Sequence, residues 1–406
     1  MRRKDKIHEL DKAIEKILEN KNLFNKVYIF GAGLIGTDIM KIMCAYSILE
    51  GFIDNDVKKQ KSGYKGYKVY SLEEYMKFSD GIIIVAVNML NRESIIGQLE
   101  NWKLKEGENF FLCEKFLNDV FPIVSLYLFQ RSFVSLAQIS LTERCTLKCQ
   151  KCAHGCFAVN YMDTKDLSLE QVYESADSFF AKFDYVYEFV LIGGEPLLYQ
   201  QLAEAIQYIG EHYRRQIGIL SITTNGTLSP DRETMNKCRK YNVLFRISNY
   251  SKSIPGLIDK YKQLTDTLDH NDIQYVLSRD DAEWYDYGFD HLIRNSGPDE
   301  LIKVFDSCKT PCREVRENKF YFCVMARSVA ENMSFDAGEN DYLDLDALNG
   351  KDYKRELLEF NLGYSEKGYL DMCNFCYGVD AKKHPVPMAE QMKMVNGDTL
   401  NEQFKL

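Results

Sequence analysis

Three cysteines, Cys145, Cys149 and Cys152, follow directly on an extended apolar run at residues 136–142. Thiolates at this spacing, on a loop that leaves a strand, can converge on three irons of a 4Fe-4S cube and leave the fourth iron without a protein ligand. An iron without a protein ligand can bind another molecule, which indicates a catalytic role for the cluster. The main alternative is a zinc site with Cys156 or His154 as fourth ligand, although zinc usually takes its ligands from two separated pairs.

Strands and helices alternate from residue 136 to about residue 278. The expected strands cover residues 136–141, 186–193, 217–223, 243–248 and 273–278, and Ser168 is a suitable N-cap for the helix in the first connection. Repeated strand–helix units of this length predict a parallel sheet with crossover helices. We therefore expect an α/β domain over this part of the chain.

The second expected strand ends in Gly193, Gly194, Glu195 and Pro196. The two glycines let the backbone approach a ligand, and the carboxylate can accept hydrogen bonds from an ammonium group. With the three cysteines about forty residues earlier, this run resembles the radical S-adenosylmethionine (SAM) superfamily. The resemblance implies that SAM chelates the open iron, that its amino group meets the Gly-Gly-Glu-Pro run, and that it is cleaved to methionine and a 5′-deoxyadenosyl radical. Lys151 stands where the family usually has an aromatic residue.

The resemblance also implies a partial (β/α)6 TIM barrel with its site at the carboxyl ends of the strands. Thr224 and Asn225 end the third expected strand and Ser248 ends the fourth, so all three become candidates for SAM contacts. Ordinary turn chemistry explains the Asn-Gly pair equally well. Arg246, inside the fourth strand, could reach a carboxylate or phosphate, or pair across the sheet.

A second group of cysteines lies towards the C-terminus, at Cys308, Cys312, Cys323, Cys373 and Cys376. We expect a hairpin turn at Asn318 and Lys319, which would place Cys323 opposite Cys312. With the later Cys-x-x-Cys pair this gives four thiolates, enough for a second 4Fe-4S cluster or for zinc. The arrangement resembles the single-cluster form of the SPASM/twitch auxiliary module. Cys308 is an alternative to Cys312 or a free thiol.

The N-terminal part predicts a Rossmann-like domain. A buried-type strand leads into a G-x-G-x-x-G turn made by Gly31, Gly33 and Gly36, and the next strand ends at Asp54, where a ribose hydroxyl would be met. The turn offers backbone N–H groups at a helix N-terminus to a phosphate. The region is similar to N-terminal domains of sugar acyltransferases and polysaccharide-biosynthesis enzymes, which implies a nucleotide or nucleotide-sugar ligand. A docking domain without a ligand is the alternative.

Composition fits a large folded chain and excludes some classes of partner. The 406 residues are 45% apolar and 13% aromatic, ample for more than one core, and the net charge of −9 argues against nucleic acid. No apolar run is long enough for a membrane span, and the charged start at residues 1–8 does not read as a signal peptide. We therefore expect a cytoplasmic protein. In the cytosol, metal ligation explains the clustered cysteines better than disulfides do.

Six segments are predicted in all. They are an N-terminal helix at 1–21, a Rossmann-like domain at 22–115, an apolar connector at 116–135, a radical SAM partial barrel at 136–300, an auxiliary-cluster module at 301–380 and a tail at 381–406. The predicted fold class is therefore α/β, a partial (β/α)6 barrel between a small parallel-sheet domain and a cysteine-rich hairpin module.

The predicted function is hydrogen abstraction from a carbon of a sugar, polyol or nucleotide-sugar, giving oxidation or epimerisation in polysaccharide or natural-product biosynthesis. An electron donor such as flavodoxin or ferredoxin would be the protein partner. For epimerisation, Cys156, Cys238 or Cys308 would return the hydrogen. The alternatives are a maturase of ribosomal peptides, a nicotinamide-dependent dehydrogenase run by the N-terminal domain, and a non-catalytic zinc-binding protein with a nucleotide-sensing domain.

Overall fold

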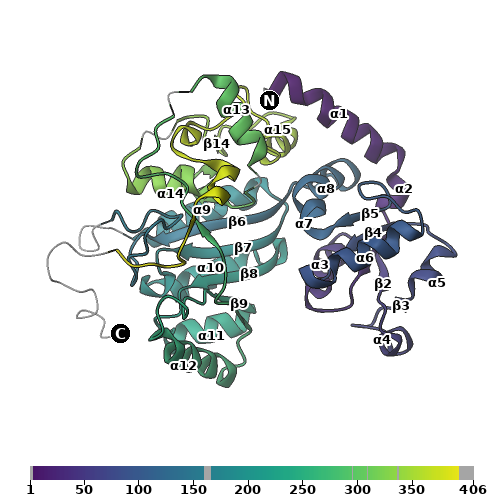
Figure 1. Cartoon of the computed structure of the whole chain (residues 1–406), viewed down its shortest axis with the longest axis horizontal. Coiled ribbons are helices and arrows are strands. Elements are labelled where there is room, and N and C mark those ends of the chain that lie inside the picture. The colour runs from purple at the N-terminus through teal and green to yellow at the C-terminus, as the bar shows by residue number, and fades with distance from the viewer. Residues whose placement is uncertain (1–2, 160–165, 295, 309, 336–337, 393–406) are drawn as a thin grey trace. The chain divides into compact units, whose positions relative to one another are not determined.

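The computed structural model describes residues 3–159, 166–294, 296–308, 310–335 and 338–392. By its internal contacts the chain divides into two compact units, Ile7–Ser135 and Leu136–Leu406 with Met1–Lys6. Figure 1 labels the helices and strands of both units. Among the described residues, no helix has both the length and the apolar character needed to cross a membrane.

The unit of Ile7–Ser135 is built on a five-stranded sheet in the order β3-β2-β1-β4-β5, and all four strand pairs are parallel. The strands are β1 (Val27–Phe30), β2 (Leu49–Ile53), β3 (Val69–Tyr70), β4 (Ile82–Val85) and β5 (Phe110–Leu112). The helices of this part of the chain are α1 (Arg3–Glu19), α2 (Lys21–Phe24), α3 (Leu34–Ala45), α4 (Val57–Ser62), α5 (Leu72–Met76), α6 (Met89–Asn101), α7 (Cys113–Lys115), the π-helical turn η1 (Phe116–Val120) and α8 (Phe121–Phe129).

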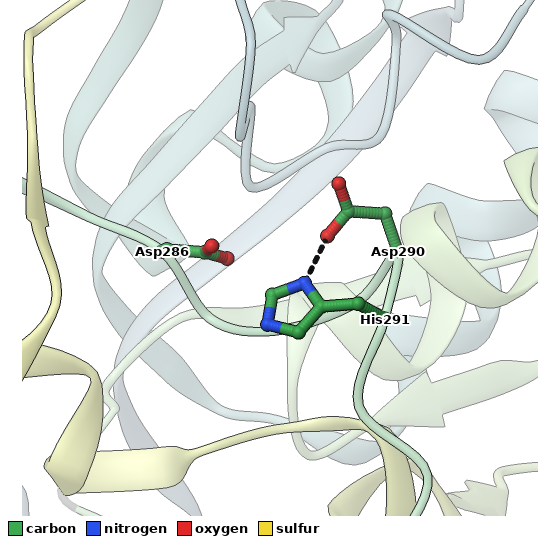
Figure 2. A group of neighbouring side chains, drawn as sticks. All are labelled: Asp286, Asp290 and His291. Atoms are coloured by element: carbon green, nitrogen blue, oxygen red, sulfur yellow. Dashed lines mark hydrogen bonds and ion pairs between the residues drawn. The ribbon is translucent and has the colours of Figure 1, made fainter.

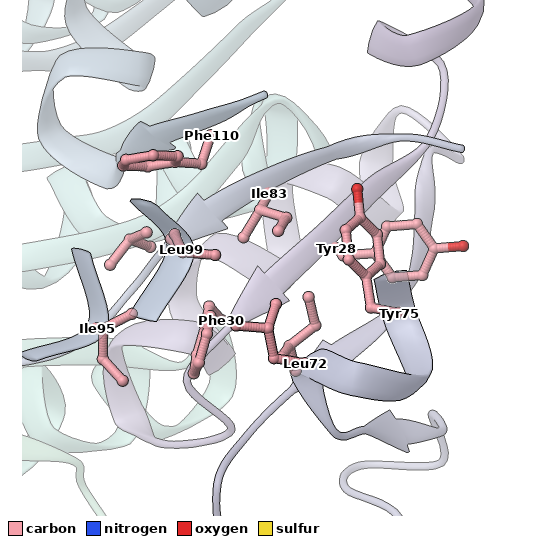
Figure 3. Packing of buried hydrophobic residues seen from close by; sticks show 10 residues of the cluster. Tyr28, Phe30, Leu72, Tyr75, Ile83, Ile95, Leu99 and Phe110 are labelled. Atoms are coloured by element: carbon pink, nitrogen blue, oxygen red, sulfur yellow. The ribbon is translucent and has the colours of Figure 1, made fainter. Parts of the chain in front are cut away.

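Buried side chains of the central strands and of α5 and α6 form a core of this unit. Figure 3 shows Tyr28 and Phe30 of β1 packed with Leu72 of α5, Ile83 of β4 and Leu99 of α6. The chain winds outward from β1 to β3 and then from β4 to β5, so the strand order reverses between β1 and β4. Such a switch point opens a crevice at the carboxyl ends of the strands. The predicted parallel sheet is thus confirmed.

The second unit contains an eight-stranded sheet in the order β10-β9-β8-β7-β6-β12-β13-β14. Its strands are β6 (Phe133–Thr142), β7 (Tyr185–Gly193), β8 (Ile217–Thr224), β9 (Val243–Ile247), β10 (Tyr275–Leu277), β12 (Arg313–Arg316), β13 (Lys319–Tyr321) and β14 (Tyr342–Asp344), while β11 (Trp284–Tyr285) and β15 (Pro385–Val386) pair separately. The helices are α9 (Leu169–Lys182), η2 (Pro196–Leu198), α10 (Leu202–His212), η3 (Arg214–Gln216), α11 (Arg232–Tyr241), α12 (Leu257–His270), α13 (Pro298–Ser307), α14 (Val324–Asn332), α15 (Tyr353–Asn361), η4 (Asp371–Phe375) and η5 (Gly378–Lys383).

The α/β prediction is confirmed, and the strands from β6 to β10 lie at the five predicted positions. Each pair from β7 to β10 is parallel, and Ser168 caps α9 by accepting from Gln171 N at 3.2 Å. The next parallel strand, β12, does not continue from β10 but pairs with β6 at the other side. Within the described residues the sheet is therefore open, with the C-terminal hairpin joined to its first strand.

The predicted hairpin is present, but its turn is one residue earlier than expected. Arg316 of β12 pairs with Lys319 of β13, so the turn residues are Glu317 and Asn318, and Glu317 takes the left-handed conformation with φ of +53°. The hairpin places Cys312 immediately before β12 and Cys323 shortly after β13. Val324 N donates to Cys312 O at 3.2 Å, which closes the open end of the hairpin.

Candidate active site

The loop after β6 brings the first three cysteines together. Cys149 is buried with Leu147, Met388 and Ala389, and the side chains of Cys145, Cys152, Tyr250, Ile254 and Trp284 pack against this group. All three are free thiols. The apolar surroundings would shield a bound group from water.

Hydrogen-bond donors point at the sulfur atoms of this loop. Cys145 Sγ accepts from Leu147 N at 3.4 Å and from Asn225 Nδ2 at 3.5 Å, and Cys149 Sγ accepts from Gln391 Nε2 at 3.2 Å. Donors of this kind orient thiolate ligands and stabilise their charge. The residues therefore fit an iron–sulfur cluster held by Cys145, Cys149 and Cys152.

The same surroundings control the protons on these thiols. Burial raises the pKa of Cys149 to about 12 and that of Cys145 well above its usual range, whereas a hydrogen bond from the Cys156 thiol lowers the pKa of Cys152 to about 6. Metal ligation requires thiolates, so assembly of a cluster here must release protons.

The run at residues 193–196 packs directly against the cysteine loop. Gly194 N donates to Thr142 O and Glu195 N to Arg144 O, each at 2.8 Å. A Cβ at Gly193 would lie 2.2 Å from Thr142 O, and a Cβ at Gly194 would lie 2.2 Å from Arg144 O. Only glycine allows this approach, so the glycine pair fixes one loop against the other.

Glu195 ties three loops together from a fully buried position. Its carboxylate accepts from Thr224 Oγ1 at 2.8 Å, Asn225 N at 2.8 Å and Leu197 N at 3.1 Å. Burial nevertheless raises the pKa of Glu195 to about 7. The sequence suggested that the Glu195 carboxylate would bind the ammonium group of SAM. In the structure three donors of the protein itself already hydrogen-bond to this carboxylate.

The loop after β8 reaches the cysteine loop through Asn225. Besides its contact with Cys145, Asn225 Nδ2 donates to Thr146 Oγ1 at 3.0 Å, and Thr146 and Thr227 share a hydrogen bond of 2.6 Å. Ser248 N, after β9, donates to Thr224 O at 2.9 Å. The predicted residues Thr224, Asn225 and Ser248 thus gather at one end of the sheet, together with Thr146 and Thr227, which sequence reasoning missed.

Lys151, at the family's usual aromatic position, turns towards a group of acidic side chains. Its ammonium group lies 3.0 Å from Asp286 Oδ2 and 2.7 Å from Asp290 Oδ2. Figure 2 shows these two aspartates with His291, whose Nδ1 is 2.7 Å from Asp290 Oδ1. Ligand atoms of the three side chains lie within 4.8 Å of one another, but Lys151 already supplies the positive charge between the carboxylates.

All five C-terminal cysteines line one cavity of about 490 Å³. Cys308 follows α13, Cys323 caps α14, and Cys373 and Cys376 lie in and after η4. Burial raises the pKa of Cys373 and of Cys376 to about 12, and in each case the nearby Cys308 adds to the effect. The cavity therefore offers one thiol more than a cube cluster or a zinc ion needs.

Residues 139–255 match the family model described as the radical SAM superfamily. The chain contains a radical SAM domain. The matched residues include the three-cysteine loop and every predicted SAM contact from Gly193 to Ser248. The auxiliary cysteines and the N-terminal unit lie outside the match.

Curated relatives of the radical SAM domain are enzymes named GTP 3′,8-cyclase. The protein from Aquifex aeolicus (strain VF5) is 34% identical over 99 residues, which cover 24% of this chain and 30% of the relative. The protein from Rhizobium etli (strain CIAT 652) is 30% identical over 129 residues, covering 31% and 35%. The chain thus spans about a third of the length of these relatives.

Solved structures with bound AdoMet are also similar, at low identity. BtrN in complex with AdoMet and 2-DOIA is 16% identical, with 64% of this chain and 97% of that chain covered and a TM-score of 0.40. The native anSMEcpe with bound AdoMet and Cp18Cys peptide is 17% identical, with 36% and 42% covered and a TM-score of 0.28.

The three proposed hydrogen donors lie in different surroundings. Cys156 is buried beside Cys152 of the radical SAM domain, and Cys308 lies among the auxiliary thiols. Cys238 is a buried residue of α11, on the same face as Thr234 and Tyr241. Packing of that helix face accounts for Cys238, and burial raises its pKa to about 12.

A buried arginine, which sequence reasoning missed, joins the radical SAM domain to the auxiliary hairpin. Arg327 of α14 pairs with Glu143, two residues before Cys145, and its Nη2 lies 2.5 Å from Glu314 Oε1 of β12. Burial opposes ionisation, but the guanidinium lowers the pKa of Glu143. No local sequence pattern could have predicted this ion pair, because Arg327 and Glu143 are 184 residues apart.

In the N-terminal unit, the glycine turn lines a cavity of about 640 Å³ at the carboxyl ends of β1, β2 and β4. Gly31 has φ of +118°, and a Cβ at Gly36 would lie 2.0 Å from Gly31 O. Asp54 also lines the cavity, but its carboxylate accepts from Ala32 N at 2.8 Å and pairs with Lys59 Nζ at 3.1 Å. The Asp54 carboxylate was predicted to bind a ribose hydroxyl. In the structure it instead hydrogen-bonds to the backbone of the glycine turn.

Proposed function

We propose that this radical SAM enzyme removes a hydrogen atom from a carbon of a polar, sugar-like substrate. The observation that carries the proposal is the convergence of the loops after β6, β7 and β8 on three free thiols. When bound there, a 4Fe-4S cluster supplies the electron that cleaves SAM to methionine and a 5′-deoxyadenosyl radical.

The strand-end residues divide the work at this site. Cys145, Cys149 and Cys152 would hold the cluster. Glu195 accepts hydrogen bonds from Thr224 and Asn225 and so fixes the loop after β8 against its own loop after β7. The backbone of residues 193–196 is then the proposed contact for the amino group of SAM, while Thr224, Asn225 and Ser248 would meet its polar atoms.

Polar side chains on one face of the sheet support a polar substrate. Phe189 packs on Phe179 and Phe180 of α9, so the neighbouring Glu188 points to the face away from the helices. Glu188 accepts from Ser221 Oγ at 2.6 Å and from Arg246 Nη2 at 2.8 Å. Ser221 and Glu188 are buried, whereas the Arg246 side chain is partly exposed and is the group of this face that could meet a sugar or polyol, whether free or linked to a nucleotide.

Oxidation of an alcohol to a ketone is the proposed reaction. The hydrogen atom of the carbinol carbon would pass to the adenosyl radical, which would give 5′-deoxyadenosine. The substrate radical would then lose its hydroxyl proton to solvent and one electron to an acceptor, which leaves the ketone. The auxiliary cavity favours this outcome, since an iron–sulfur cluster held by four of its five thiols would supply an acceptor for that electron. Cys308 adjoins the other four thiols and is a ligand candidate on a par with Cys312.

Epimerisation is the second candidate, because both sites offer a thiol beyond those needed as ligands. Cys156 lies beside the first site, and the fifth cysteine lines the second. A thiol that returns a hydrogen atom to the opposite face of the substrate radical inverts the carbon and becomes a thiyl radical. One electron from the external donor and a proton from solvent would restore the thiol. Product formed in heavy water would then carry deuterium at that carbon, whereas a ketone would not.

The proposal extends to the N-terminal unit and to a protein partner. The cavity at Gly31 to Ile35 lies at the starts of α3 and α6, where N–H groups can bind phosphate. We assign it a nucleotide or nucleotide-sugar. Flavodoxin or ferredoxin in the cytoplasm is the proposed electron donor, since SAM cleavage consumes an electron that must come from outside.

The deciding experiment measures iron, sulfide and zinc in anaerobically reconstituted protein, with EPR spectra and an assay for 5′-deoxyadenosine under dithionite. We expect about eight irons in the wild type and about four in the variant Cys145→Ala/Cys149→Ala/Cys152→Ala, which should lose the deoxyadenosine. Cys238→Ala is the matched control, because this buried cysteine lies in α11, and it should keep both. Colourless protein with stoichiometric zinc would overturn the proposal in favour of a zinc-binding scaffold.

A further inference from the structure

The segment after the auxiliary module returns to the three-cysteine loop. β15 pairs with β11, and the chain then forms an antiparallel bridge between Gln391 and Cys149. Gln150 N donates to Glu390 O at 2.7 Å, and Met392 N donates to Lys148 O at 2.8 Å. Two backbone hydrogen bonds thus hold residues 390–392 against the loop that carries the cysteines.

The side chain of Gln391 is oriented by what surrounds it. Its Oε1 accepts from Lys148 N at 2.8 Å, while its Nε2 donates to Cys149 Sγ at 3.2 Å and to Ala389 O at 2.8 Å. A backbone N–H can only donate and a carbonyl can only accept. The amide oxygen must therefore face Lys148, and the NH2 group must face the sulfur.

Apolar residues of the same segment cover the loop. Met388 and Ala389 are 7% and 0% exposed and belong to the group against which Cys145 and Cys152 pack. The Gln391 amide is thus partly buried beside apolar side chains. A hydrogen bond in such surroundings is electrostatically stronger than one exposed to water.

We propose that Gln391 is a positioning residue that tunes the reduction potential of the cluster at Cys145, Cys149 and Cys152. This inference rests on the proposed function. An N–H donated to a ligand sulfur stabilises the more electron-rich, reduced state, and hydrogen bonds to sulfur are among the factors that set such potentials. Gln391 therefore makes the one-electron reduction that precedes SAM cleavage easier.

The test is an EPR-monitored titration with dithionite of the cluster whose signal changes when SAM is added. Gln391→Met fills the space without an amide and keeps the backbone bridge. In this variant we expect the equilibrium constant for one-electron reduction of the cluster to decrease about tenfold, which shifts the reduction potential by about 59 mV to more negative values. Gln391→Glu, which places an oxygen against the sulfur, should shift it further in the same direction.

Gln150→Met is the matched control. Its side-chain Nε2 donates to Gln391 O at 3.2 Å, so the variant weakens the same segment without removing the donor to Cys149. Its potential should stay near that of the wild type. An unchanged potential in Gln391→Met, or an equal shift in both variants, would overturn the inference while leaving the cluster itself established by its iron and its EPR signal.

A second measurement needs no substitution. Pulsed EPR on reduced wild-type protein with ¹⁵N-labelled glutamine amides should detect a nitrogen coupled to the cluster, since Nε2 lies 3.2 Å from the ligand sulfur. Absence of this coupling would overturn the role of Gln391. A wild type without any SAM-responsive cluster would overturn the inference and the proposed function together.

Discussion

Glu195 is a buried acid on which the loops after β7 and β8 depend. Burial raises its pKa from 4.5 to about 7, so the folded state holds a proton there that the unfolded chain releases above about pH 4.5. The protonated form contributes stability that is fully present below pH 4.5 and is lost as the pH rises through 7. At most about 3 kcal/mol is lost over this range.

Glu195→Gln should remove this dependence. Urea unfolding of the cluster-free protein at several pH values between 4.5 and 8 would give the free energy of unfolding for wild type and variant. We expect the wild type to lose more stability than the variant as the pH rises. Glu204→Gln, at an exposed position of α10, should follow the wild type. If the free energy of unfolding of Glu195→Gln changed with pH in parallel with that of the wild type, the Glu195 carboxylate would be ionised throughout this pH range.

At the scale of elements, α14 is held to the sheet by charges that water does not reach. Arg327 is 2% exposed, and Glu143 and Glu314 are 6% and 0% exposed. Removing one partner of a buried ionic group leaves uncompensated charge and typically costs 3–5 kcal/mol. We therefore expect Arg327→Met to lower the free energy of unfolding by about that amount, and Arg327→Met with Glu143→Gln and Glu314→Gln to recover part of it.

Arg316→Met is the control for this prediction. Arg316 pairs with Glu331, whose side chain is 50% exposed, at 3.2 Å. Exposed ion pairs contribute about 0–1 kcal/mol, so urea unfolding should show a small change. If Arg327→Met and Arg316→Met lowered the free energy of unfolding by similar amounts, packing and not the buried charges would hold α14 in place.

What the sequence predicts at this scale is local. The three-cysteine spacing, the alternating strands and the Ser168 cap depend on residues close together in the chain, and these predictions located β6 to β10 and α9 well. Gln391 lies 242 residues from Cys149, and Arg327 lies 184 from Glu143. Their contacts arise only when distant segments pack, so no spacing rule could identify them. The hairpin turn was misplaced by one residue because Glu317, and not a residue typical of turns, takes the left-handed conformation.

At the scale of the whole molecule, two compact units carry separate candidate sites. The three-cysteine loop and the C-terminal cysteines belong to the unit of Leu136–Leu406. The cavity at the glycine turn belongs to the unit of Ile7–Ser135. A phosphate-bearing ligand in that cavity should therefore protect only the segments that line it. This gives a test of the nucleotide assignment that does not depend on cluster assembly.

Gly33 offers a clean way to block the cavity. It lines the cavity and adopts an extended conformation, and a Cβ there would meet nothing within 4 Å. Gly33→Glu should therefore fold normally while placing a carboxylate where a phosphate would bind. Gly97→Glu on α6 is the matched control, because a Cβ there also meets open space and Gly97 does not line the cavity.

Hydrogen exchange of the full chain, with UDP-glucose and inorganic phosphate as probes, would decide the matter. With UDP-glucose we expect slower exchange in peptides covering residues 30–36 and 86–95 of the wild type and of Gly97→Glu, and no such protection in Gly33→Glu. Protection by phosphate alone would show that the glycine turn binds the anion and that the sugar adds little. Equal protection in Gly33→Glu would place the ligand elsewhere. No protection by either probe in the wild type would favour a docking domain, because a ligand that binds the folded state must stabilise the region it contacts.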